Sequence, residues 1–142
     1  MTPERLFSLC NSVALIGWVI LVLFGRMRWV ARLITGAVIP LLIAILYIYL
    51  IAAHWGESQG GFGTLDGVAA LFSNRWLLLA GWIHYLAFDL FIGSWEVRDS
   101  QMLGMPHLLV IPCLALTFLF GPAGLLLYFI VRTARTRSLE LK

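Results

Sequence analysis

The sequence predicts an all-α polytopic membrane protein, a four-transmembrane-helix bundle forming a single domain over residues 1–142. Of the 142 residues, 61% are hydrophobic and 12% are charged, and the mean hydropathy is +0.94. A soluble domain of this size cannot bury that much apolar surface. A bilayer core about 30 Å thick needs about 20 apolar residues per helix, and four stretches reach that length: about 5–25, 33–53, 75–94 and 107–131.

The first two stretches carry features typical of helix packing in membranes. Asn11 lies in the first, where we expect it to hydrogen-bond to another helix. The second has small residues at intervals of four, which would let another helix approach closely: Gly36, Pro40 and Ala44.

A short interfacial helix is expected between the second and third stretches, within residues 58–74. This segment is glycine-rich and then apolar, and it is too short to span a bilayer. Thr64 can cap the helix, with Asp66 in its first turn to complement the helix dipole. A surface helix and a lid over a lipid entry gap are both compatible with this pattern.

The third stretch contains Asp89, the principal candidate for a functional group. A carboxylate at the centre of a bilayer helix costs roughly 2.5 to 3.5 kcal/mol on insertion scales, so such residues usually mark a site or a partner. At 100° per residue, one stripe holds Trp82, Tyr85, Asp89, Gly93 and Glu96, and another about 140° away holds His84 and Phe88. His84 and Asp89 are therefore not expected to pair with each other.

Residues 94–107 are predicted to form a charged connection after the third stretch. Glu96, Arg98, Asp99 and His107 lie there, and they could converge with Asp89 at one membrane face. The alternative is that Arg98 pairs with Glu96 or Asp99 in water, where such pairs contribute little.

Two prolines interrupt the fourth stretch. Pro112 and Pro122 each remove a helical hydrogen bond to the residue four positions earlier, so the carbonyls of Leu108 and Phe118 should be free. Thr117 is close enough in sequence to help satisfy them.

The composition and the spacing of polar residues argue against several other classes of function. The net charge of +3 comes from arginines at loops and the tail, which suits lipid head groups and gives no nucleic-acid signal. No histidine or carboxylate spacing typical of metal sites occurs, and we expect no metal or other cofactor. The two cysteines, Cys10 and Cys113, fall in different stretches and form no redox motif.

The membrane orientation is ambiguous at the level of sequence. Basic residues gather in two clusters, near 26–32 and 132–142, which three predicted spans separate. They would then lie on opposite faces, against the rule that basic loops are cytoplasmic. An error in the number of spans would also explain the conflict.

The chain resembles a known family in its second half. The resemblance is carried by WIHYLAFDLFIG at 82–93, PH at 106–107, PCL at 112–114 and TFLFGPAG at 117–124. These segments resemble the abscisic-acid-deficient-four-like membrane proteins, a domain of unknown function whose plastid members are implicated in making neoxanthin from violaxanthin. We see no signal or transit peptide, so the resemblance implies a bacterial-type member in the inner (cytoplasmic) membrane.

This resemblance implies a cofactor-free isomerase acting on a carotenoid or other isoprenoid lipid. Epoxide opening to an allene needs one proton delivered to oxygen and another removed from carbon. Asp89 is the expected base, with His84 or His107 as the acid. Five further residues are the expected substrate-binding groups: Trp82, Tyr85, Phe88, Glu96 and Arg98.

Two other functions remain open. The protein could assist the assembly of other membrane enzymes through its small-residue faces, or it could form a small proton- or ion-conducting oligomer using Asp89 and His84. The expected partners are accordingly the lipid bilayer, an isoprenoid ligand, and either further copies of the chain or a partner membrane enzyme.

Overall fold

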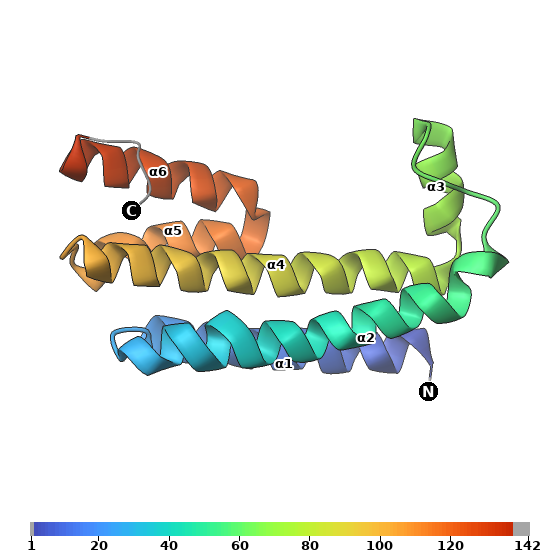
Figure 1. Cartoon of the computed structure of the whole chain (residues 1–142), viewed down its shortest axis with the longest axis horizontal. Coiled ribbons are helices and arrows are strands. Elements are labelled where there is room, and N and C mark those ends of the chain that lie inside the picture. Colours follow the sequence, from blue (N-terminus) through green and yellow to red (C-terminus); the bar gives the residue numbers. More distant parts are fainter. Residues whose placement is uncertain (1, 138–142) are drawn as a thin grey trace.

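The computed structural model describes residues 2–137, which form helices and connections without any β-strand in that range. Three long rods, α1, the continuous η1–α2 helix and α4, lie side by side, and α5 and α6 cover only one half of α4 (Figure 1). The elements in order are α1 (Pro3–Phe24), η1 (Val30–Val38), α2 (Ile39–His54), η2 (Trp55–Glu57), α3 (Leu65–Ser73), α4 (Arg75–Met102), α5 (His107–Phe120) and α6 (Pro122–Thr136).

The second rod begins as a π-helix over Val30–Val38, and Pro40 lies just beyond the end of this π segment. Proline has no N–H, and its ring crowds the carbonyl four residues earlier. The wider π register accommodates this, and the N–H of Ile39 donates to the carbonyl of Ile34, five residues back. From Ile39 onward the rod continues as α2, which contains Pro40, and it ends in η2.

The small residues of the second rod pack against α4 of the same chain. Gly36 and Pro40 are buried, and a Cβ placed on Gly36 would lie 3.5 Å from the Cβ of Ser94. Ser94 also donates a hydrogen bond to the Thr35 hydroxyl at 2.8 Å. The helix that this stripe admits is therefore α4, as small residues at helix interfaces allow.

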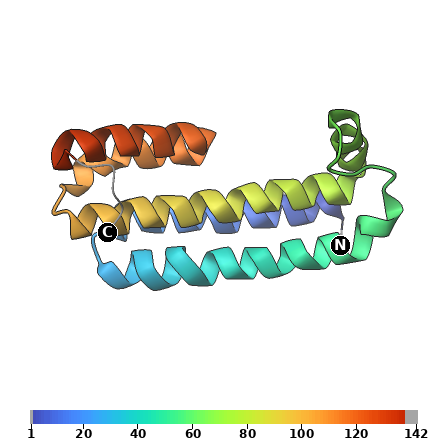
Figure 2. The same cartoon turned by 45° about the horizontal axis from the view of Figure 1, so that its top comes forward.

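The expected short helix forms as α3, which stands away from the bundle at one end (Figure 2). The hydroxyl of Thr64 accepts a hydrogen bond from the backbone N–H of Gly67 at 3.0 Å, so Thr64 is the N-cap. Asp66 lies in the first turn, as predicted. The location of α3 at a membrane surface stays a prediction.

The central helix α4 is longer than the sequence indicated. Asn74 caps it by accepting hydrogen bonds from the N–H groups of Trp76 and Leu77, and the helix continues without a break to Met102. The prediction that the helix ends at residue 94, where a loop begins, is therefore wrong. The helix can continue because Glu96 and Asp99 find hydrogen-bonding partners on α5 and α6.

The stretch 107–131, predicted as one helix, is a hairpin of two. Gly121 breaks it with φ +44 and ψ −94, a conformation that excludes ordinary side chains, and Pro122 starts α6 in the reverse direction. The two helices have 14 and 15 residues, or about 20 Å each, which is too short to cross a bilayer.

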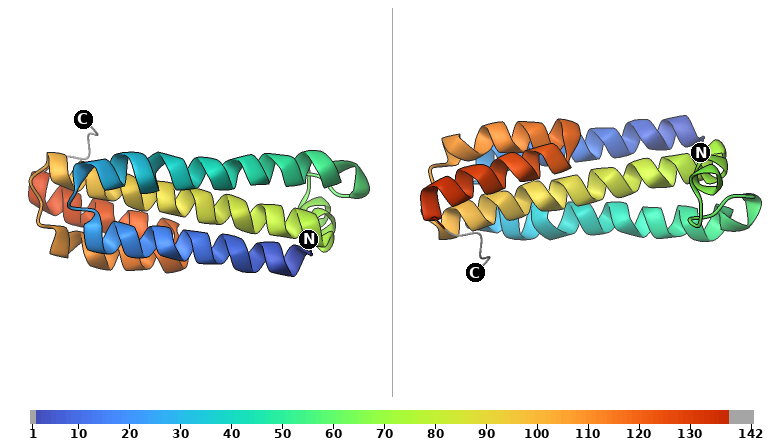
Figure 3. Two further views of the ribbon diagram at one scale, coloured as in Figure 1. Left: turned by 90° about the horizontal axis from the view of Figure 1, so that it is seen from below. Right: turned by 90° about the horizontal axis from the view of Figure 1, so that it is seen from above.

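By length and composition, three helical segments of the described chain could cross a membrane: Pro3–Phe24, Val30–Glu57 and Arg75–Met102. The predicted count of four spans is thus not confirmed. In Figure 1, α1 and α2 lie on one side of α4 and the α5–α6 hairpin lies on the other. Seen from below, α1 and α2 flank α4 (Figure 3).

The hairpin brings both basic clusters to one end of the bundle. The α1–η1 connection and the end of α6 lie at the same end in Figure 1. The expectation that the clusters lie on opposite faces is therefore wrong, because it assumed that residues 107–131 cross the membrane once. The described arginines of the two clusters are Arg26, Arg28, Arg32, Arg132, Arg135 and Arg137; Lys142 lies outside the described residues.

Candidate functional site

Asp89 lies half-way along α4 and faces the tip of the α5–α6 hairpin. The helix has 28 residues, so Asp89 is about 20 Å from each of its ends. A Cβ placed on Gly121 would lie 2.8 Å from Oδ1 of Asp89, so any larger residue at the hairpin tip would have to displace the carboxylate. The carboxylate is thus held at the middle of a helix long enough to cross a membrane.

The carboxylate of Asp89 is only partly enclosed. The residue as a whole is half-buried, but its Oδ2 is buried and has no hydrogen-bond partner among residues 2–137. A buried carboxylate oxygen without a partner costs free energy, so it requires an explanation such as a ligand or a catalytic role.

Tyr85, one turn before Asp89, joins α4 to the hairpin. Its hydroxyl lies beside Asp89 and donates a hydrogen bond to the carbonyl of Phe118 at 3.1 Å. This is one of the two carbonyls expected to be free because of a proline four residues later, and Tyr85 satisfies it. A proton-bearing hydroxyl therefore lies next to the carboxylate.

Glu96 lies two turns beyond Asp89 on the same stripe and is completely buried. Its Oε1 accepts a hydrogen bond from the hydroxyl of Thr117 at 2.9 Å, while its Oε2 is buried without a partner in the described chain. Gly124 of α6 packs directly on Thr117, and a Cβ there would collide with the threonine. The close approach of α5 and α6 thus positions the threonine against Glu96.

Asp99 fixes the far end of the hairpin through a buried ion pair. Its Oδ2 accepts hydrogen bonds from Tyr128 at 2.6 Å and from Nε of Arg132 at 2.9 Å. Asp99 and Arg132 are 2% and 1% exposed. The alternative in which Arg98 pairs with Glu96 or Asp99 in water is therefore wrong, because both carboxylates point into the hairpin.

The structure separates the remaining charged candidates from Asp89. Arg98 lies over the ring of Phe91 at 5.8 Å, on another face of α4. His107 begins α5 at the basic end, with Nε2 2.9 Å from the carbonyl of Val22. Since α5 is about 20 Å long, His107 lies far from the hairpin tip where Asp89 is.

His84 and Phe88 face away from the hairpin, as their separate stripe predicted. The His84 ring is 5.7 Å from that of Tyr47 on α2 and 4.5 Å from that of Phe88. Neither histidine proposed as the acid is therefore brought to Asp89. The hydroxyl beside the carboxylate belongs to Tyr85.

An apolar groove runs between α1 and α4 on the half of α4 that the hairpin leaves uncovered. Trp82 lies at its inner end, in ring contact with Tyr85 at 5.2 Å, and donates through Nε1 to Oδ1 of Asn11 at 3.0 Å. Asn11 thus forms the interhelical hydrogen bond predicted for it. The groove has a volume of about 380 Å³ and is lined by Pro3, Glu4, Phe7, Ser8, Arg75, Leu78, Leu79 and Trp82.

This arrangement provides acid–base groups within reach of an apolar groove. Asp89 can accept a proton, and Tyr85 beside it can donate one. Glu96 and Asp99 continue the polar stripe towards the basic end. Within residues 2–137, no group of three or more His, Cys, Asp or Glu side chains is placed to hold a metal ion.

A comparison with protein families identifies the chain. The model of the family described as ABA DEFICIENT 4-like matches residues 5–128, which is most of the sequence. The chain belongs to this family. No curated protein and no solved structure gives a significant match. The part of this ABA4-like protein that matches contains Asp89, Glu96, Thr117 and Tyr128, whereas Arg132 lies beyond it.

Sequence reasoning missed three contributors to the site of this ABA4-like protein. Gly121 precedes Pro122, and a Gly-Pro pair inside an apolar stretch is a signal for a reversal of the chain. Tyr128 and Arg132 are one turn apart in α6. An arginine one turn from a tyrosine in an apolar helix could have indicated a buried acidic partner.

Proposed function

We propose that this ABA4-like protein is an isomerase that moves protons on an isoprenoid lipid at Asp89. The observation that carries the proposal is the half-buried carboxylate of Asp89, which lies at the hairpin tip, half-way along α4, with one oxygen unpartnered. Ionisable groups at membrane depth are costly and are usually retained for function.

Access from the bilayer supports a lipid-soluble substrate. Because the hairpin ends at Gly121, it leaves the first half of α4 uncovered (Figure 2). The apolar groove follows this half and ends at Trp82, whose ring contacts Tyr85 beside Asp89. A long apolar molecule lying in the groove would present one end to the carboxylate. Phe88, on the other stripe, does not line this path.

The proposed chemistry needs no oxidant or reductant. For an epoxide substrate, the Asp89 carboxylate removes a proton from carbon, and the electron pair of the C–H bond forms a new C=C bond. The epoxide C–O bond breaks, and its oxygen takes a proton from the Tyr85 hydroxyl. Proton transfer from Asp89 to the Tyr85 phenolate then restores both groups. Each acid or base positioned in this way increases the reaction rate by a factor of about 10² to 10⁴.

Profiling of pigments and isoprenoid lipids in a carotenoid-producing bacterium tests the proposal. Cells carrying the wild type should accumulate an isomer of unchanged mass, and Asp89→Asn should reduce it by at least about 10²-fold. Asp66→Asn is the matched control, because Asp66 is exposed in the first turn of α3. Equal product from Asp89→Asn, or no new isomer from the folded wild type, would overturn the proposal.

A further inference from the structure

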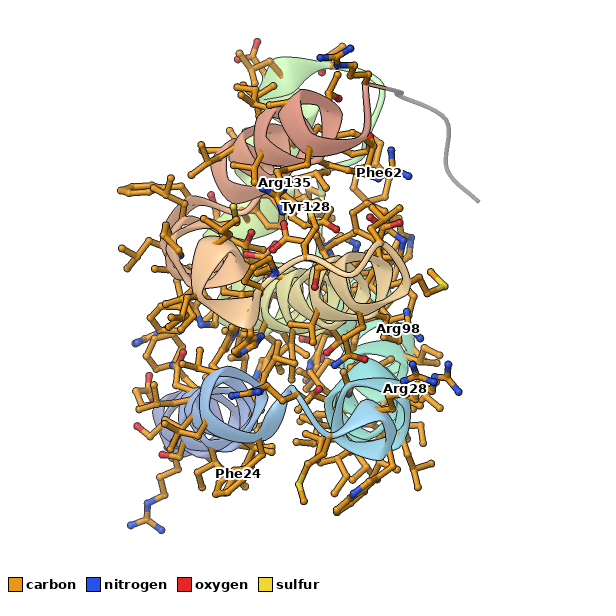
Figure 4. The ribbon with its side chains drawn as sticks, turned by 90° about the vertical axis from the view of Figure 1, so that its left-hand side faces the viewer. Phe24, Arg28, Phe62, Arg98, Tyr128 and Arg135 are labelled. Carbon is orange, nitrogen blue, oxygen red and sulfur yellow. The ribbon has the colours of Figure 1, made fainter. Side chains whose placement is uncertain are left out.

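A second hollow lies at the basic end of the bundle, between the start of the second rod and the last turns of α4. It has a volume of about 560 Å³ and is lined by Arg28, Arg32, Trp95, Arg98, Gln101 and Met102. Arg28 and Arg32 come from the start of the second rod, whereas Arg98 comes from the last turns of α4. Arg28 and Arg98 lie on the same side in the view from this end, and Arg135 lies apart from them beside Tyr128 on the hairpin (Figure 4).

The lining carries three positive charges and no negative one. No ion pair within residues 2–137 involves Arg28, Arg32 or Arg98. The acidic residues nearest in sequence, Glu96 and Asp99, are buried and face Thr117 and Arg132 on the hairpin side. Three like charges around one hollow repel each other, so an anion that enters it is attracted by all three.

Two hydrogen bonds hold the second rod and its preceding connection in place against α4. Gln101 donates from Nε2 to the carbonyl of Gly25 in the α1–η1 connection. On the other side, Ser94 donates to Thr35 at 2.8 Å, and both side chains are buried. The backbone that carries the arginines is therefore fixed before any ligand arrives, which lowers the entropic cost of binding.

We propose that this three-arginine hollow binds a phosphate group. The guanidinium group presents planar pairs of N–H donors that match phosphate oxygens in a bidentate manner. The hollow opens at the end of the bundle where lipid head groups would lie, so the phosphate can belong to an anionic lipid or to a soluble phosphate or diphosphate compound. The site uses none of the side chains around Asp89.

Binding measurements on the detergent-solubilised full chain test this proposal. The two probes are phosphatidylglycerol in mixed micelles, compared with phosphatidylcholine, and inorganic pyrophosphate. We expect at least one of them to bind and to raise the unfolding temperature. Binding of phosphatidylglycerol alone would assign the hollow to lipid head groups, binding of pyrophosphate alone to soluble phosphates, and mutual displacement to phosphate from either source.

Arginine variants distinguish binding in the hollow from general attraction of anions to the positive charge of this end. Arg32→Gln and Arg98→Gln should each weaken binding by about tenfold or more, because each removes a charged phosphate contact. Arg28→Gln, at an exposed position, supplies a third variant if either of these fails to fold. Arg135→Gln is the control, since Arg135 is an exposed arginine of the same end that does not line the hollow. The proposal is overturned if neither probe binds, or if Arg135→Gln weakens binding as much as the hollow variants do.

Discussion

The backbone of Gly121 lies directly against the carboxylate of Asp89, so that a Cβ on the glycine would come within 2.8 Å of Oδ1. The residue that reverses the chain is thus also the one that contacts the mid-membrane acid. This contact links the fold of the hairpin to the proposed chemistry.

Gly121→Ala should destabilise the protein and disturb Asp89. The alanine must adopt φ +44, which costs about 1 to 3 kcal/mol at such strained positions, and its methyl group must displace the carboxylate. Thermal unfolding in detergent should show the loss. Gly63→Ala is the control, because a Cβ at Gly63 would meet nothing within 4 Å; equal melting temperatures for both variants would contradict the described turn.

Breaking the buried ion pair should release the hairpin from α4. Asp99→Asn or Arg132→Met leaves one charge buried without its partner, and such changes cost about 3 to 5 kcal/mol. The double variant should recover part of this loss, since no lone charge remains. A double-mutant cycle measured by denaturation provides the coupling free energy, and additive effects would show that the pair is not formed.

Tyr85→Phe should separate catalysis from stability. It removes one hydrogen bond to the Phe118 carbonyl, which contributes about 1 kcal/mol, and it also removes the proposed proton donor. We therefore expect a small change in melting temperature and a decrease in isomer formation by a factor of about 10² or more. Tyr49→Phe, at an exposed position of α2, should change neither quantity. If Tyr85→Phe retains full product formation, another group supplies the proton.

Thiol labelling should place both basic clusters on the cytoplasmic side. Single cysteines replace Arg26, Arg135 or Phe62 in a background lacking Cys10 and Cys113. By the positive-inside rule, an impermeant reagent applied to intact cells should label the cysteine at position 62 only, and permeabilised cells should show all three labelled. A single span over 107–131 would instead put positions 26 and 135 on opposite sides, so labelling of only one of them in intact cells would contradict the hairpin.

Several features of this ABA4-like protein could be predicted from individual residues. Asn11 was expected to bond another helix and does so with Trp82. Thr64 was expected to cap a short helix, and the Phe118 carbonyl was expected to need a donor, which is Tyr85. The predictions for Thr64 and Phe118 depend on local rules of capping and of proline within a few residues. The prediction for Asn11 depends on the need of a polar side chain in an apolar helix for a partner, and the sequence did not identify Trp82 as that partner. The roles of His84, His107 and Arg98 in substrate binding or catalysis stay predictions.

The sequence by itself determined the membrane class, the helical fold and the prominence of Asp89, because long apolar stretches can satisfy their backbone in lipid only as helices and an acid within them stands out. Only the tertiary structure decided whether residues 107–131 form one span or a hairpin, since the hydropathy of the stretch is the same either way. The hairpin is stabilised by contacts across the chain, from Gly121 to Asp89, Thr117 to Glu96 and Arg132 to Asp99. These contacts join residues more than 20 positions apart, and no local pattern encodes them.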